Sequence, residues 1–343
     1  MEQHEITEAG PLLDGQGNLR EAGYAKRLLP IYDRNQVKGG ALRIKEWDYY
    51  LVMNGQFGLA LTIADNSYMG LDSVSLLDVW ENTQITKSPM RLLPMGSTGM
   101  PASSAEGDCA SGGRGYSLLF RREEDKRVLY AHMENFRGRE ALDAYVELTD
   151  EPEESMVICT PFDKPGHFYF NQKINCLRAS GKVPVGEDEY MLDPADSFGV
   201  LDWGRGVWTY HNTWYWASAS GLAEKVPFGF NLGYGFGDTS AATENMLFYN
   251  GKAHKLSRVR FKIPGRRRRR RYMEQWEFTS DDGRFEMRFD PVMDRSACTG
   301  VGVIKSDQHQ IFGRFTGLAL LDDGTEVFVK DFMGFAEEVE NKW

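Results

Sequence analysis

The stretch FGFNLGYGFGD, residues 228–238, decides the fold. Its even positions from 228 to 236 carry large apolar side chains, and its odd positions carry glycine with one exception, Asn231. Successive side chains of a strand point to opposite faces, so this alternation predicts a β-strand. Because glycine offers nothing to pack, one face of the strand would be bare. We therefore expect that face to accept neighbouring rings or to border a space.

The preceding segment supplies the rings. Trp208, Trp214 and Trp216 all fall at even positions and would share one face of a neighbouring strand. Two interpretations stay open. The rings pack onto the glycines and leave no cavity, as in most protein interiors, or they line a pocket for a small apolar ligand, with Asn231 as the lone polar group of the glycine face.

Elsewhere the chain favours strands and tight turns. Asn-Gly at 54–55 and 250–251 is a hairpin dipeptide, and Asp-Gly lies between apolar alternations at 282–283 and 323–324. Helical spacing is scarce. A short helix is expected before Pro30 in the segment 19–34, and residues 139–148 fit either a helix or a strand. This pattern predicts a mainly antiparallel β protein with few short helices.

A weak internal repeat predicts two similar halves. FGLALTIAD, residues 57–65, has the same large/small alternation as 228–238, and each copy follows an aromatic strand. A chain of 343 residues is too long for one typical core. Two eight-stranded barrels of roughly 130–160 residues fit it. The expected units are an arm at 1–40, a first barrel at 41–192 and a second at 193–343, divided at the turn-rich 193–197.

Composition argues against several functional classes. The chain has 40 basic and 50 acidic residues, a net charge of -10, and should as a whole repel nucleic acid and anionic membranes. No apolar run approaches the roughly 20 residues of a membrane helix. The opening MEQHEITEAG lacks the features of a secretion signal. Four scattered cysteines and six histidines show no metal spacing. We expect a cytoplasmic, bacterial-type protein with no metal or cofactor and no integral membrane segment.

Charged residues flank the tryptophan and glycine strands. In DWGRG, residues 202–206, Asp202 and Arg205 form a structural ion pair or orient the polar end of a ligand, and Trp203 lies between them. The two glycines suggest a bulge that re-aims side chains. Three polar residues follow the glycine strand and are candidates for the same barrel mouth: Asp238, Glu244 and Asn245.

A run of six arginines, residues 266–271, falls where a hairpin loop is due. Such runs can bind nucleic acid or acidic partners. No aromatic platform accompanies this one, so we interpret it as a solvated loop of an acidic protein.

Several motifs together resemble one family. The chain resembles the uncharacterised bacterial family known as domain of unknown function 2804. The motifs that carry the resemblance are ITEAGPLLDGQGNLREAGYAKRLL (6–29), IKEWDYYLV (44–52), LDWGRGVW (201–208), TWYWASASG (213–221) and GFNLGYGFGD (229–238), the last followed by Glu244-Asn245. This resemblance implies no activity. A more distant one, to carotenoid hydratase and tocopherol cyclase, implies two consecutive antiparallel lipocalin-like (calycin-type) β-barrels.

Two functional hypotheses follow, beside a third in which filled barrels serve a structural role. The first is a binding protein whose second barrel holds a lipid- or isoprenoid-like ligand against the tryptophans. The second is a hydratase or cyclase that protonates an isoprenoid-like alkene. It needs a carboxylic acid kept neutral by burial and indole faces to stabilise a carbocation. The acid would be Asp202 or, if Asp202 pairs with Arg205, Asp238, because a nearby cation lowers a carboxyl pKa.

Overall fold

Nearly the whole chain is β-structure in the computed structural model, which describes residues 3–267, 269–301 and 304–342. The described residues form no α-helix, only two 3-10 turns, η1 (Arg34–Gln36) and η2 (Ala41–Arg43). The short helix expected within 19–34 is absent, because β2 (Gly23–Ala25) and β3 (Pro30–Ile31) extend that segment. Residues 139–148 belong to a strand, β12 (Glu140–Thr149).

The first sheet curls around the first hydrophobic core. Its hydrogen-bonded order is β7-β6-β5-β4-β16-β14-β12-β11-β10-β9, with β2, β8, β13 and β15 attached at its margins. β5 lies beside β9, and β7 beside β11, so the sheet almost closes into a barrel. Its further strands are β4 (Lys45–Met53), β5 (Phe57–Asp65), β6 (Met69–Asp78), β7 (Thr83–Lys87), β8 (Met90–Leu92), β9 (Cys109–Gly113), β10 (Tyr116–Arg122), β11 (Arg127–Arg137), β13 (Met156–Pro161), β14 (Phe168–Val185), β15 (Asp188–Leu192) and β16 (Phe198–Val207).

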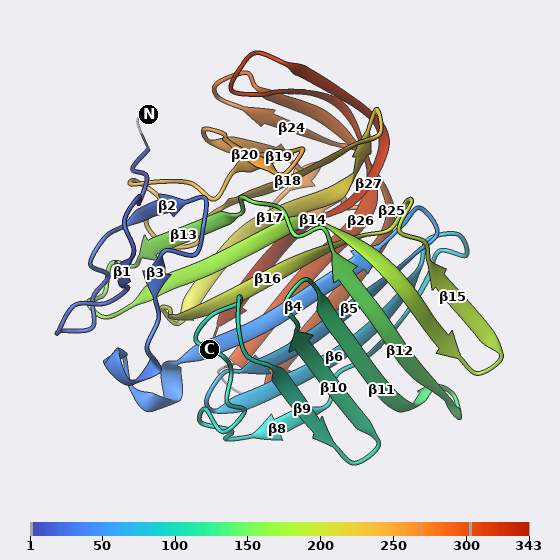
Figure 1. Cartoon of the computed structure of the whole chain (residues 1–343), viewed down its shortest axis with the longest axis horizontal. Coiled ribbons are helices and arrows are strands. Elements are labelled where there is room, and N and C mark those ends of the chain that lie inside the picture. The colour runs from blue at the N-terminus through green and yellow to red at the C-terminus, as the bar shows by residue number, and fades with distance from the viewer. Residues whose placement is uncertain (1–2, 268, 302–303, 343) are drawn as a thin grey trace.

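The second sheet forms the second barrel, with the order β20-β19-β18-β17-β27-β26-β25-β24-β21. β21 also lies beside β18. The strands are β17 (His211–Ala223), β18 (Val226–Tyr234), β19 (Met246–Tyr249), β20 (Lys252–Lys255), β21 (Val259–Lys262), β24 (Trp276–Ser280), β25 (Phe285–Val301), β26 (Ile304–Leu320) and β27 (Glu326–Lys342). Two small pairs complete the structure: β1 (Gly10–Pro11) with β3, and β22 (Gly265–Arg266) with β23 (Arg269–Arg270). The prediction of two consecutive antiparallel lipocalin-like barrels is confirmed, as Figure 1 shows.

The expected hairpins form at all four predicted turns. Asn54-Gly55 joins β4 to β5, and Asn250-Gly251 joins β19 to β20. The Asp-Gly pairs at 282–283 and 323–324 join β24 to β25 and β26 to β27. Asn250 has a φ of 49° and Gly251 a φ of 80°, the left-handed geometry that a tight hairpin turn requires.

The change from one sheet to the other falls at residues 208–210. The turn at 193–197, where the sequence pattern placed the division, instead joins β15 to β16. β16 pairs with β14 on one side and β4 on the other, so residues 198–207 complete the first sheet. The motif LDWGRGVW is therefore a central strand of the first barrel rather than the start of the second.

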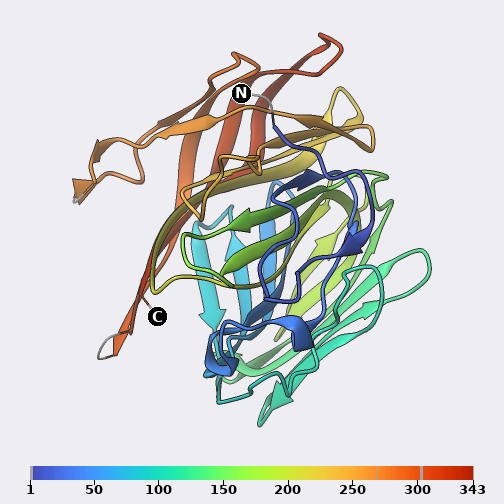
Figure 2. The same ribbon diagram turned by 90° about the vertical axis from the view of Figure 1, so that its left-hand side faces the viewer.

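The two barrels pack against each other through their outer faces. β14 and β16 lie against β17, and β14 also lies against β18 (Figure 2). The N-terminal arm spans both barrels: β2 pairs with β13 of the first sheet, and the His4 amide donates to the Ala241 carbonyl at 2.9 Å. No helix among the described residues is long and apolar enough to cross a membrane.

The arginine run forms the β22–β23 hairpin and the residues after it, which project from the second barrel (Figure 2). Arg266, Arg267 and Arg269 are exposed. Arg268 lies outside the described residues. Arg270 bends back to an ion pair with Glu338 at 3.1 Å, so at least one member of the run anchors the hairpin to the barrel.

Candidate functional site

The tryptophan face and the glycine face are one surface of the second sheet. Trp216 pairs with Gly233 across β17 and β18, and Ser218 pairs with Asn231. This surface faces the first barrel rather than the lumen of the second. The opposite side chains of β18, Phe228 and Phe230 among them, fill that lumen. The bare face is therefore part of the contact between the barrels.

Other side chains occupy the space that the glycines leave. A Cβ atom at Gly233 would lie 2.5 Å from the Glu244 carboxylate, and one at Gly229 would lie 2.8 Å from the Cys176 sulfur. A ring packed onto glycine is found in the first barrel instead, where the Trp47 indole lies directly over Gly204. The Glu244 carboxylate and the Cys176 thiol thus fill the space beside Gly233 and Gly229, where aromatic rings were expected.

Asp202 and Arg205 do not pair with each other, because they lie on opposite faces of β16. Asp202 faces the second barrel, where it forms a 2.7 Å ion pair with Lys173 and accepts a 2.6 Å hydrogen bond from Asn171. Arg205 faces the core of the first barrel and pairs with Asp48 at 3.0 Å. Its guanidinium lies 4.2 Å from the ring centre of Trp203, which is fully buried.

The side chains packed between the two barrels form the inter-barrel layer, which includes the buried carboxyl of Glu337 on β27. Only 3% of it is exposed. Its two oxygens accept hydrogen bonds from the Trp214 indole and from the Gln310 amide, each at 2.9 Å. Burial raises the pKa of Glu337 to about 7, although the Trp214 hydrogen bond and the charge of Lys173 act in the opposite direction. A carboxyl with such a pKa can both donate and accept a proton near neutral pH.

Asn231 and Glu244 connect the glycine strand to this layer. The Trp216 indole donates to the Asn231 side chain at 2.7 Å, and Asn231 donates to the Glu244 carbonyl at 2.8 Å. Burial raises the pKa of the Glu244 carboxyl, and the charge of Lys173 opposes that shift. Asn245 accepts the Gly233 amide at 2.7 Å. These bonds fix the loop that follows β18 against the barrel contact.

An aromatic wall borders the layer on one side. The Phe236 ring meets Trp208 and Trp214 edge-on at 5.4 Å, and Tyr169 at 4.9 Å. Trp47 meets Trp208 at 5.4 Å. The half-buried Trp214 belongs to this wall and also binds Glu337, so it joins an apolar surface to an ionisable group.

Trp216 is enclosed more tightly than Trp214. The Lys173 ammonium lies 3.8 Å from its ring centre. Tyr49 and Phe335 meet it edge-on at 6.0 and 4.7 Å. Trp216 therefore holds the two barrels together, whereas Trp214 is only half-buried.

Asp238 lies apart from the cluster. It is exposed, on the turn after the glycine strand, where its carboxylate accepts the Ser240 amide at 2.9 Å. Asp238 is therefore not part of the group of side chains between the barrels.

Sequence reasoning missed the residues that bring the layer together: Tyr49, Tyr169, Lys173, Gln310 and Glu337. A signal for two of them was present. Lys173 ends a polar triplet, 171–173, between the aromatic residues 168–170 and Ile174, and Glu337 adjoins Glu338 between Ala336 and Val339. Two adjacent glutamates in a strand must point to opposite faces, so a strand buried on both sides buries both. Which side chains meet across the layer depends on how the barrels dock.

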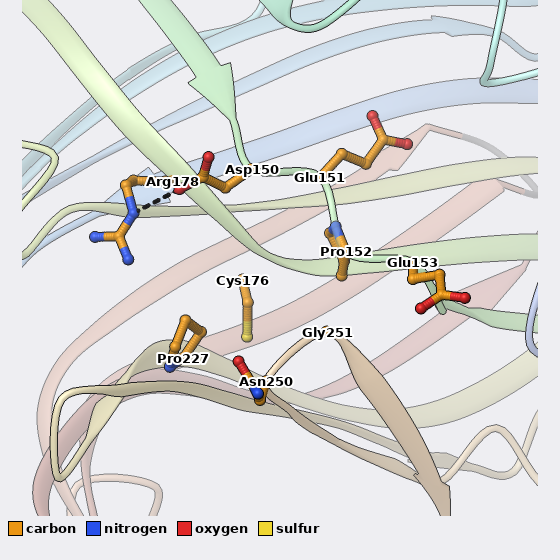
Figure 3. A pocket seen from close by; sticks show the side chains of 9 residues that line it. All are labelled: Asp150, Glu151, Pro152, Glu153, Cys176, Arg178, Pro227, Asn250 and Gly251. Atoms are coloured by element: carbon orange, nitrogen blue, oxygen red, sulfur yellow. Dashed lines mark hydrogen bonds and ion pairs between the residues drawn. The ribbon is translucent and has the colours of Figure 1, made fainter.

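A cavity of about 290 Å³ lies elsewhere on the contact between the barrels (Figure 3). It opens between the loop after β12, the bulge of β14 and the β19–β20 turn, and the Arg178–Asp150 ion pair of 2.9 Å lies at its side. Its lining is Asp150, Glu151, Pro152, Glu153, Cys176, Arg178, Pro227, Asn250 and Gly251. This lining contains no tryptophan, so it is not the pocket that the sequence pattern predicted. Across the described residues, no group of three or more His, Cys, Asp or Glu side chains is placed to hold a metal ion.

Comparison with known proteins places the chain by fold and by family. Among solved structures, it is similar to kievitone hydratase from Nectria haematococca, with a TM-score of 0.50 and 11% identity over 97% of this chain and 98% of that one. It is also similar to CghA, with a TM-score of 0.48 and 12% identity over 99% and 97%. No curated protein sequence matches the chain significantly. The family model for the domain of unknown function DUF2804 matches residues 3–343, and the chain therefore belongs to that family.

Proposed function

We propose that this protein binds a small, mainly apolar molecule between its two barrels, against Trp214, and that Glu337 transfers a proton to or from it. The observation that carries the proposal is the Glu337 carboxyl itself. It is nearly sealed from solvent, it is held by two neutral donors, and it adjoins the aromatic wall. A group with these properties is suited to general acid–base catalysis on an apolar substrate.

The chemistry that fits is addition to a carbon–carbon double bond. Protonated Glu337 would give its proton to one alkene carbon, so that its O–H bond breaks as a C–H bond forms. The positive charge on the other carbon would face the indole and phenol rings, which attract cations. Water would then add and return a proton to the Glu337 carboxylate, which gives hydration. Attack by a second double bond, followed by loss of a proton, would give cyclisation.

Lys173 and Asp202 have a positioning role in this proposal. Their ion pair lies under the face of Trp216, beside the layer that holds Glu337. The Lys173 charge favours release of the Glu337 proton, and Asp202 opposes it. The hydratase activity in the name of one structural neighbour agrees with this reaction class, although a likeness at 11% identity supports it only through the fold.

Ligand binding without turnover is the second candidate. Asp202 is fully engaged by Lys173 and Asn171, and the side chain of Glu244 covers the glycine face. Because the Asp202 carboxylate already has protein partners and Glu244 fills the space beside the glycines, these groups favour holding an apolar guest over reacting with it.

The two candidates differ in what happens to a bound molecule. The purified chain would be incubated with an apolar extract of its expression host, and both the bound and the free fractions would be analysed by mass spectrometry. The enzyme predicts a compound that gains the mass of one water or changes retention at constant mass. Glu337→Gln should abolish this conversion. Glu340→Gln, on the same strand but paired with His211 at the surface, should retain it.

A bound compound that stays unchanged in both variants would assign the protein to ligand binding. If no compound is retained or converted, both candidates are wrong.

A further inference from the structure

The loop around β8 displays apolar side chains to solvent. Leu92 is 86% exposed, Met90 67%, Leu93 53% and Met95 41%. Scattered exposed apolar residues are ordinary, but contiguous ones mark an interaction site. These four lie within six consecutive residues at one end of the first barrel, at the lower edge of the view in Figure 1.

The backbone holds these side chains outward. Leu93 has a φ of 50° and Met95 a φ of 53°, a left-handed conformation that large apolar residues rarely adopt. Their amides donate to the carbonyls of Tyr68 and Ser67, each at 3.1 Å. Such strain persists only where the surroundings enforce it, and it is concentrated at functional positions. The fold therefore holds this loop in one defined conformation with its apolar side chains exposed.

The base of the loop is also anchored. Arg91, between the exposed Met90 and Leu92, turns inward to an ion pair with Asp72 at 3.0 Å. The side chain of Asp65 accepts the Gly96 amide at 2.9 Å.

Two segments at this end are locally basic, although Arg34 and Arg91 are paired with carboxylates and Lys45 is buried. Residues 82–105 contain two basic and no acidic residues, and residues 34–45 contain four basic and no acidic ones, in a chain of net charge -10. The two segments meet at Ser67, whose hydroxyl donates to the Ile44 carbonyl at 2.8 Å and whose carbonyl accepts the Met95 amide.

The basic residues and one further apolar residue complete the surface. Lys38, Arg43 and Lys87 are exposed, and so is Leu42 on η2. The two segments thus expose both apolar side chains and cations.

We propose that this end of the first barrel docks onto an anionic lipid membrane, with Met90, Leu92, Leu93 and Met95 entering the interface. Apolar side chains beside Lys and Arg match the boundary between acyl chains and anionic headgroups. The negative charge of the whole chain does not prevent this contact, because salt screens charges more than about 10 Å away. The proposal does not depend on the reaction assigned to Glu337.

The test is vesicle co-sedimentation of the full chain. The probes are unilamellar vesicles of phosphatidylcholine alone and of phosphatidylcholine with phosphatidylglycerol. We expect binding to the anionic vesicles that weakens with salt, and weaker binding to the neutral ones. Met90→Ser combined with Leu92→Ser should raise the apparent dissociation constant at least about tenfold, because two apolar side chains no longer leave water. Both residues are exposed, so the variant should fold.

Trp80 provides the matched control. It is 83% exposed but follows the opposite end of β6, about 30 Å from the β8 loop. Trp80→Ser should bind the vesicles as the unaltered chain does. Equal binding of neutral and anionic vesicles, unchanged binding by the loop variant, or a solution dimer that the loop variant abolishes would overturn the proposal, the last by assigning the surface to a second copy.

Discussion

The Trp214 indole donates a 2.9 Å hydrogen bond to Glu337, which places a half-buried ring and a buried carboxyl in direct contact between two barrels. The carboxyl has a pKa near 7, so the charge that the indole meets changes around neutral pH. The fluorescence of Trp214 should therefore report the protonation state of Glu337.

Stability should fall as pH rises from about 4.5 to about 7 because of the raised pKa of Glu337. Its pKa is about 7 in the folded chain and near 4.5 when exposed. The folded state therefore binds a proton that the unfolded state releases. This contribution is complete below about pH 4.5 and is lost as pH rises through about 7, a difference of about 3 kcal/mol. Urea unfolding at a series of pH values measures it.

Glu337→Gln should flatten this part of the pH profile, because glutamine does not titrate. Glu340→Gln, which removes a surface carboxyl from the same strand, is the control for removing a carboxyl as such. A slope equal in the parent and in Glu337→Gln would show that Glu337 does not have a raised pKa, and would remove the basis for its role as an acid.

The Lys173–Asp202 pair should be strongly coupled. Lys173→Met leaves the buried Asp202 carboxylate without its cation, and loss of one member of a buried pair costs about 3–5 kcal/mol. Lys173→Met with Asp202→Asn should recover much of that loss, because no charge remains unpaired. A double-mutant cycle in urea measures the coupling. Additive losses would mean that solvent, rather than Lys173, compensates Asp202.

Two glycines that look alike in the sequence should tolerate alanine differently. At Gly204 the new methyl group would enter the Trp47 ring, which is packed against Trp208 and Tyr169. Overpacking of this kind costs about 1–3 kcal/mol. At Gly233 it would meet the flexible end of the Glu244 side chain, which can rotate away. Thermal unfolding of the two variants should give a larger loss for Gly204→Ala, and the reverse order would contradict this packing.

Local pattern was sufficient to predict the strands, four hairpins and the double barrel. Alternation at 228–238 has period two, and Asn-Gly or Asp-Gly between such runs permits few structures other than a hairpin. The division between the barrels was not predictable in the same way. The turn at 193–197 has strong turn chemistry, but whether the next strand stays in a sheet depends on its hydrogen-bonded partners, here β4 and β14.

The candidate site was only partly predictable for a related reason. Alternation correctly placed Trp214 and Trp216 on one face with Asn231. It also implied that Asp202 and Arg205, three residues apart, point in opposite directions, a consequence that the proposed ion pair ignored. Glu337 and Lys173 come from strands about 160 residues apart in the chain, and no local period encodes a contact made by docking two finished barrels.

Leu93→Gly should weaken membrane binding by the β8 loop without lowering the stability of the fold. Leu93 has a φ of 50°, and glycine adopts this conformation without the steric cost that leucine bears, which is about 1 kcal/mol. The greater freedom of glycine in the unfolded chain offsets part of this gain. The Leu93 side chain is exposed and loses little packing. We therefore expect an unchanged or slightly higher melting temperature together with weaker binding to anionic vesicles. A clear fall in melting temperature would show that the side chain supports the barrel, and would remove the strain argument for a membrane-facing loop.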